Sequence, residues 1–210
     1  MISRTILALV ISVAIAIPGV AQKKKQPLPS QEEMTKRWKD FMTPGESHKV
    51  LDQFVGSWET ESNIWMAGPG KPPTTTKGTA EVKWVLGGRF VQQELTGQMM
   101  DMPWNGIGFT GYDNFKKKYT SFWIDNSTTA MATSEGTINK EGTIITSWGK
   151  MDQPMTGEKD KKVKYIETIT DHDKHVFEIH DLSLPDPTTR SSRSSIQERN
   201  SSRLFRRPGT

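Results

Sequence analysis

Nine segments between residues 57 and 182 alternate apolar with polar side chains, and this period of two constrains the fold more than any other feature. They are rich in Thr, Val, Ile and aromatic residues and are separated by turn-forming residues, which predicts β-strands. The predicted strands are residues 57–66, 78–86, 89–98, 106–112, 119–125, 130–138, 143–150, 162–170 and 175–182. No long helical pattern interrupts them, so the sequence predicts an all-β barrel or sandwich of antiparallel strands.

Two short helices are predicted before the first strand. In the segment of residues 30–42, Ser30 can cap the helix and Glu33 can complete a capping box. A shorter helical turn, residues 46–54, leads directly into the sequence Gly-Ser-Trp that ends at Trp58. Because both helices precede every strand, we expect the turn to close one end of a barrel, its base, and Trp58 to be largely buried there.

The lengths of the connections favour a barrel with one closed end and one open end. If consecutive strands run up and down, the connections alternate between the two ends of the barrel. Those nearest the helices are tight, such as Gly87-Gly88, whereas the opposite end carries residues 67–77, 99–105 and 151–161. A closed base and an open mouth suit ligand binding, because binding residues tend to lie on loops held by a rigid scaffold.

Strand alternation predicts which side chains face the lumen. Lys162 and Lys164 should face water, which turns Glu167 inward, and the same reasoning turns Trp84 inward and Lys83 outward. Carboxylates in an apolar row need a hydrogen-bond partner, a cation or a raised pKa.

The strand of residues 89–98 has two possible inner rows. The row of Phe90, Gln92 and Glu94 is partly polar, and the opposite row begins at Val91. Taking the first row as the lumen face adds polar groups that could contact a ligand. The mouth segments are rich in Met, which is adaptable and suits a variable apolar ligand; alternatively these side chains fold inward as a plug. The candidate ligand-binding residues are Met66, Trp84, Phe90, Gln92, Glu94, Met99, Met100, Trp104, Trp123, Asp125, Met155 and Glu167.

The stretch from residue 43 to residue 181 resembles a bacterial family known as domain of unknown function 1579. The matching pieces are TPGESHKVL, FVGSWE, GGRFVQQE, GFTGYDNFKKKY, WIDN, MATSEG, PMTG and VFEIHD, in the expected order. The resemblance implies an antiparallel up-and-down calycin (lipocalin-like) barrel, in which a Trp following a short helix packs across the closed base. It implies no activity.

A looser similarity links the chain to nitrobindins, which are haem-binding barrels that use a His near the end of the domain. His180 lies in the last predicted strand and is the candidate haem ligand by this similarity. Nitrobindins repeat glycines after their Gly-x-Trp, however, whereas this chain reads GSWETESNIW. No bound cofactor is therefore predicted. The segment DHDKH, residues 171–175, contains metal-ligand residue types but lies in a predicted tight turn, so no metal is predicted either.

The first 21 residues have the pattern of a secretory signal peptide. Arg4 precedes an apolar run over residues 6–17, and Gly19-Val20-Ala21 follows. The run is shorter than the roughly 20 residues that a spanning helix needs, which favours cleavage over retention as an anchor. We therefore expect a periplasmic or extracellular protein without a transmembrane span in its mature part. The absence of Cys excludes disulfides and Cys-based zinc sites.

The net charge of +4 belongs to the C-terminal segment, residues 183–210, which holds six Arg against two acidic residues. Residues 22–182 hold 21 Lys plus Arg against 22 Asp plus Glu, so a nucleic-acid surface is not expected on the folded domain. The segment lacks apolar alternation and is predicted to be a disordered tail that leaves the barrel open. A change of reading frame after about residue 187 would explain its composition; a genuine basic tail is the alternative.

These observations predict a signal peptide (residues 1–21), a linker with short helices (22–54), a barrel (55–182) and a tail (183–210). The predicted function is binding of a small apolar or amphipathic ligand in the lumen. One alternative is an enzyme that uses lumen carboxylates for acid and base chemistry; another is a structural envelope protein with a plugged barrel. Binding is favoured because no nucleophile motif is present.

Overall fold

The computed structural model describes residues 28–65, 70–154, 156–171, 173–182 and 190–198. The predicted signal segment, Met66 and Met155 lie outside the described residues. None of the helices within the described ranges is long and apolar enough to cross a membrane.

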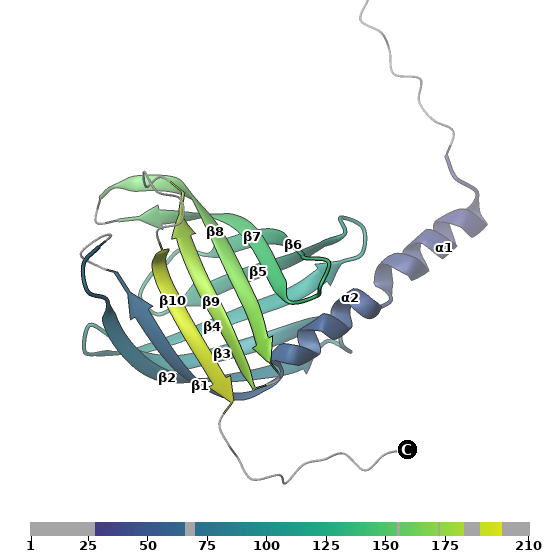
Figure 1. The fold of residues 1–210 in the computed structure, drawn as a ribbon. Helices are drawn as coiled ribbons and strands as arrows, with labels where there is room; N and C mark the ends of the chain where they lie inside the picture. Colours follow the sequence, from purple (N-terminus) through teal and green to yellow (C-terminus); the bar gives the residue numbers. More distant parts are fainter. Residues whose placement is uncertain (1–27, 66–69, 155, 172, 183–189, 199–210) are drawn as a thin grey trace, which may run out of the picture.

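Ten antiparallel strands in the described part of the chain form one closed barrel (Figure 1). Neighbours in sequence are neighbours in the barrel, and β10 lies between β1 and β9. The strands are β1 (Gly56–Ile64), β2 (Thr74–Val85), β3 (Phe90–Met99), β4 (Met102–Asp113), β5 (Lys118–Asp125), β6 (Ala132–Ile138), β7 (Ile144–Gln153), β8 (Glu158–Asp171), β9 (Lys174–Asp181) and β10 (Arg190–Glu198). The predicted up-and-down antiparallel barrel is confirmed.

Two helices and a 3-10 turn precede the barrel: α1 (Gln31–Met42), α2 (Glu46–Lys49) and η1 (Val50–Phe54). Ser30 caps α1 as predicted, because its Oγ accepts a hydrogen bond from the backbone N–H of Glu33 at 3.1 Å. The Glu33 carboxylate pairs with Arg37 instead of completing the capping box. Helix α1 buries none of its residues and projects away from the barrel (Figure 1).

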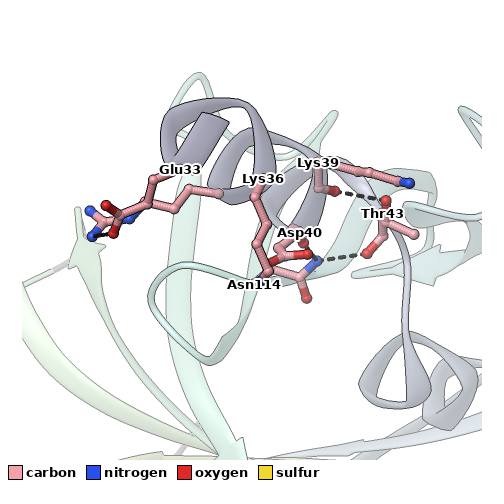
Figure 2. A network of polar contacts seen from close by, with 7 residues as sticks. Glu33, Lys36, Lys39, Asp40, Thr43 and Asn114 are labelled. Atoms are coloured by element: carbon pink, nitrogen blue, oxygen red, sulfur yellow. Dashed lines mark hydrogen bonds and ion pairs between the residues drawn. The ribbon is translucent and has the colours of Figure 1, made fainter. Parts of the chain in front are cut away.

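Asn114, in the turn between β4 and β5, holds the C-terminal end of α1 to the barrel. Its Nδ2 lies 2.8 Å from the carbonyl oxygen of Thr43 and 3.1 Å from that of Asp40 (Figure 2). The last carbonyls of a helix have no partner within the helix, so this side chain supplies one. The contact anchors an otherwise exposed helix at one end.

The base of the barrel is closed by α2 and η1, as predicted. Leu51 is fully buried and Phe54 is 8% exposed. Gly56, with φ of 148°, then turns the chain into β1 through a conformation that favours glycine. Trp58 is 2% exposed, and its indole Nε1 donates to the carbonyl oxygen of Phe54 at 2.9 Å. The Gly-x-Trp sequence therefore seals the base.

The mouth has shorter connections than the sequence suggested. Residues 99–105 were expected to form a loop, but β3 and β4 continue through this region and are joined by Met100 and Asp101 alone. Both residues have positive φ, 51° and 60°, as in the tight hairpin turns usually made by Asn or Gly. Most of residues 151–161 are likewise in β7 and β8. The prediction of long mouth loops at these two places was wrong.

The prediction that residues 183–210 contain no regular strand was also wrong. Residues 190–198 form β10, which pairs with β1 along Ile64 to Trp58 and with β9 along His180 to Lys174. Nine strands would leave the backbone groups of β1 and β9 unpaired at two edges, and backbone pairing does not require apolar side chains. Backbone pairing with β1 and β9 therefore stabilises β10 even though this polar segment lacks apolar alternation.

Removing β10 should loosen its two neighbours selectively. We expect a chain truncated after residue 189 to lose amide exchange protection in β1 and β9, because their outer N–H and C=O groups lose their partners. Strands β5 and β6 are the internal control, since they lie across the ring from the cut. Unchanged protection in β1 and β9 would show that β10 does not close the barrel in solution.

Tyr119 should make the stability of the base depend on alkaline pH. Its side chain is 3% exposed and donates to the carbonyl oxygen of Ser47 at 2.9 Å. Burial raises the pKa of Tyr119 from 10.0 to about 12. The folded state therefore retains a proton that the unfolded chain releases, so this contribution is complete below about pH 10 and is lost as the pH rises through about 12.

Substitution Tyr119→Phe should lower the free energy of unfolding by about 1 kcal/mol at neutral pH, because the hydrogen bond to Ser47 is lost. It should also flatten the decline of stability between about pH 10 and 11. Urea unfolding of both proteins at neutral pH and across this interval measures both effects. Parallel pH profiles would contradict the assignment to Tyr119.

Candidate functional site

The cross-strand register determines which side chains face the lumen. Trp58 lies inside the base, and it pairs with Ala80 of β2, which pairs with Leu95 of β3. Leu95 pairs with Gly106 of β4, which pairs with Asp125 of β5. Directly paired residues lie on the same face of a sheet, so all five positions belong to the inner row.

Three predicted site residues lie on the outer face instead. Phe90, Gln92 and Glu94 have the opposite parity to Leu95, and Phe90 is 37% exposed. Glu94 Oε1 accepts hydrogen bonds from Gln92 at 2.6 Å and from Lys83 at 3.2 Å, both on the outer surface. The assignment of this row to the lumen was wrong.

The signal for the correct row was present in the neighbouring strand. Glu94 pairs with Glu81 and Gln92 pairs with Lys83, and alternation had already placed Lys83 outside. Paired residues share a face, so Val91 rather than Gln92 faces the interior, where it is 4% exposed. Local polarity misled the prediction because neither row of β3 is wholly apolar.

Trp84 lies on the inner face, as predicted, but it belongs to the base. Its Nε1 donates to Asp52 Oδ1 of η1 at 2.6 Å, and its ring packs against the buried core cluster. This hydrogen bond therefore connects β2 to η1 at the base, far from the mouth.

An aromatic wall covers the inner face of β4 and β5. The rings of Trp104 and Trp123 stack with centroids 5.9 Å apart and an interplanar angle of 27°. Trp123 lies directly over Gly106 and Gly108, where an added Cβ would stand 2.0 and 2.6 Å from its ring. Its Nε1 donates to Asp125 Oδ2 at 3.0 Å, which fixes the orientation of the ring. Three predicted site residues are thus brought together.

A second aromatic pair lines β8 and β9. Tyr165 and Phe177 stack with centroids 5.9 Å apart at an angle of 12°. Both lie in the inner row. Phe177 pairs with the inward-facing Glu167, and Tyr165, which pairs with Ile179, lies two residues from Glu167 on the same face of β8. Burial raises the pKa of Tyr165 above its ordinary value of 10.0.

Glu167 faces inward as predicted and has a partner that the sequence reading missed. Its Oε1 lies 2.5 Å from Nδ1 of His175, which is 5% exposed. The His175 ring also packs edge to face against Trp58 and Phe54, with centroids 4.7 and 5.1 Å away. His175, the first residue of the predicted strand 175–182, begins the inner row of β9, where it pairs with Ile169 and lies beside Glu167.

Burial of the inner row changes along the barrel. Near the base, inner residues such as Trp58, Ala80 and Ile145 are less than 9% exposed. Further toward the mouth most inner side chains are half-buried. The exceptions are Val163 and Asp181, which pair with each other and are buried, the buried Gly106 and Gly108 beneath Trp123, and the exposed Thr74 and Met102. The half-buried inner residues include Ile64, Leu95, Met99, Trp104, Ser121, Trp123, Ser134, Ser147, Met151, Tyr165, Phe177 and Ile179. Solvent therefore reaches the inner surface above a sealed base.

The rim carries methionines and a cluster of charges. Met99 is half-buried, whereas Met100 is 60% exposed in the hairpin turn. Lys161, at the mouth end of β8, pairs with Asp181 at 2.8 Å and with Glu158 at 3.0 Å. The hydrogen bond to Asp181 raises the pKa of Lys161. An open hollow of about 320 Å³ adjoins this cluster and is lined by Glu158, Lys159, Lys161, Lys162 and Leu182.

His180 lies outside the lumen. It has the opposite parity to Phe177 and Ile179, and its Nε2 is 3.5 Å from Glu178 Oε2. The strand alternation therefore removes His180 as a candidate ligand for haem in the lumen. Among the described residues no group of three or more His, Cys, Asp or Glu is arranged to hold a metal ion.

Substitution Gly106→Ala should displace the Trp123 ring. The added Cβ would overlap that ring, so we expect a loss of about 1–3 kcal/mol in stability together with a changed near-UV circular dichroism signal. The control is Gly97→Ala in β3, where the added carbon has its nearest neighbour at 3.4 Å. Equal behaviour of the two variants would mean that Trp123 does not lie flat on β4.

Comparison with solved structures supports the barrel. The chain is similar to the crystal structure of Rv2717c from M. tuberculosis, with 13% identity, a TM-score of 0.53, and coverage of 75% of this chain and 100% of that one. A redesigned beta barrel also matches, with 11% identity, a TM-score of 0.39, and coverage of 72% of this chain and 96% of that one. Among curated proteins none matches this chain. The model of the family described as "Protein of unknown function (DUF1579)" matches residues 43–188, and the chain belongs to this family.

Proposed function

We propose that this protein is an exported β-barrel that binds a small apolar or amphipathic molecule in the upper part of its lumen. The observation that carries the proposal is the gradient of burial along the inner row. A barrel that served only as a scaffold would bury its inner side chains over its whole length, as it does near Trp58 and Ile145.

The size and chemistry of the lumen support this proposal. Barrels of eight strands are wide enough to hold one small ligand, and the interior widens with strand number; this barrel has ten. The half-buried inner surface combines apolar and aromatic side chains with polar ones, and the hydroxyls of Ser121 and Ser134 lie 2.7 Å apart on it. Such a mixed surface suits an amphipathic molecule.

Binding is favoured over catalysis because the lumen carboxylates already have partners. Glu167 is bonded to His175, and Asp125 accepts hydrogen bonds from Trp123 and Ser127. Glu94, the third predicted acid, lies on the outer face. A general base needs a substrate proton within hydrogen-bond reach, and these acids instead fix neighbouring side chains. A plugged structural barrel is disfavoured by the part-exposed inner rings.

Export is proposed from the sequence of residues 1–21, whose charged start, apolar run and small residues follow the secretory pattern. The near-neutral balance of residues 22–182 agrees with a small-molecule partner rather than a nucleic acid. Ligand binding in the lumen can be tested without knowing the cellular location, on the mature barrel itself.

A pair of neighbouring substitutions in β6 tests the proposed site. Ser134→Trp places a large side chain in the inner row, whereas Thr133→Trp places it on the exposed outer face of the same strand. We expect Ser134→Trp to weaken binding of the fluorescent fatty acid cis-parinaric acid or of 3-hydroxyflavone by about tenfold or more, and Thr133→Trp by less than about twofold.

Thermal unfolding of both variants checks that each remains folded. Native mass spectrometry of the protein purified from its own host should also show a co-purifying small molecule. If neither probe binds the unsubstituted protein, or if both variants bind as it does, the lumen is not the binding site.

A further inference from the structure

We infer that the ligand of the proposed lumen site contains a flat conjugated ring system, held between two aromatic walls. This inference rests on the proposed function and specifies the class of molecule. One wall is the Trp104–Trp123 pair of β4 and β5, and the other is the Tyr165–Phe177 pair of β8 and β9.

The two walls lie on different sides of the lumen. In the ring of strands, β4 and β5 are separated from β8 and β9 by two strands in one direction and by four in the other. Figure 1 shows β8 and β9 in front and β4 and β5 behind them. The rings on these strands therefore face one another across the interior rather than forming one continuous patch.

The walls also lie at matching heights. Tyr119 of β5 and Ile169 of β8 both pack in the hydrophobic cluster at the base. Trp123 is four residues nearer the mouth than Tyr119, and Tyr165 is four residues nearer the mouth than Ile169. At about 3.3 Å of rise per residue, each ring lies roughly 13 Å further along its strand than the base cluster.

Glycines under the rings make these walls flat. Gly106 and Gly108 allow Trp123 to lie against the backbone of β4, and an added Cβ at Gly149 of β7 would stand 3.1 Å from the ring of Tyr165. Trp123 is further held by its hydrogen bond to Asp125. Flat and restrained rings favour stacking on another ring, because aromatic pairs gain energy beyond their buried area when they adopt offset or edge-to-face geometries.

One polar group on the first wall has no partner. Nε1 of Trp104 is buried and makes no hydrogen bond within the described residues. An indole N–H can only donate, and a buried donor without an acceptor is costly. A ligand with a carbonyl or ether oxygen at the edge of its ring would satisfy this donor once a small shift of the Trp104 ring exposes Nε1. The inferred class is a planar conjugated molecule that carries an oxygen acceptor.

Two probes of similar size separate this class from acyl chains. 3-Hydroxyflavone is planar and has a carbonyl, whereas cis-parinaric acid is a linear polyene fatty acid. We expect the flavone to bind at least about tenfold more tightly than the fatty acid. Replacing either Trp123 or Tyr165 by Leu should weaken flavone binding by about tenfold and change fatty-acid binding by less than about threefold.

Trp104→Phe tests the unpaired donor, because it removes the N–H while keeping a smaller aromatic ring, and a hydrocarbon probe controls for the lost stacking area. It should weaken the binding of flavone by about fivefold more than that of 2-phenylnaphthalene, an aromatic hydrocarbon without an oxygen acceptor. Near-UV circular dichroism and thermal unfolding of each variant confirm that the barrel is intact. If the Leu variants unfold at the same temperature as the unsubstituted protein but bind the flavone more weakly, that would further support a direct contact.

The outcomes distinguish this inference from the proposed function. If the fatty acid binds as tightly as the flavone, or if the Leu variants affect both probes equally, the inference is overturned while lumen binding stands. If neither probe binds, lumen binding fails and the inference fails with it. Selective loss of flavone binding in the Trp123 and Tyr165 variants supports the inference.

Discussion

Closure of the ring of strands is the constraint on which the rest of this structure depends. Each strand pairs on both sides, so its backbone donors and acceptors are satisfied, and the pairing determines which side chains face inward. One residue inside the base, Trp58, then places Ala80, Leu95 and Gly106 on the same inner row through successive pairs. A slip of one residue in any strand would exchange its inner and outer faces.

The sequence predicts well the features that depend on neighbouring residues. Alternation located nine strands, and the capping pattern at Ser30 and the burial of Trp58 were both confirmed. The features it missed depend on distant partners. The inner face of β3 follows from its pairing with β2, and β10 forms because β1 and β9 both need a neighbour. The hairpin at Met100 was missed because positive φ usually indicates Gly or Asn.

The same distinction applies to the candidate site. Trp104, Trp123 and Asp125 were identified separately, on two strands, and only the structure shows that the two rings stack and that Asp125 holds one of them. Phe177 was missed altogether, since an aromatic residue in a strand usually indicates packing in a core. His175 was predicted to begin the last strand, but its contact with Glu167 was missed because that contact joins two strands. Pairing across β8 and β9 was the information that the sequence lacked.

The polar groups that hold neighbouring side chains in place inside the barrel differ from the group that we propose to contact a ligand. Burying a polar group is costly unless it is hydrogen-bonded, and the acids of the inner row meet this requirement through His175, Trp123 and Lys161. These pairs hold strands and rings in place and leave the lumen without a free carboxylate among them. Two inner-row nitrogens differ from these groups, because Nε2 of His175 and Nε1 of Trp104 are buried without a hydrogen-bond partner in the described residues; of the two, the one beside a half-exposed ring toward the mouth is Nε1 of Trp104. The cost of this unpaired donor is tolerable if an acceptor arrives from outside the chain, and we therefore propose that recognition in this barrel depends on a neutral donor and flat apolar surfaces rather than on charge.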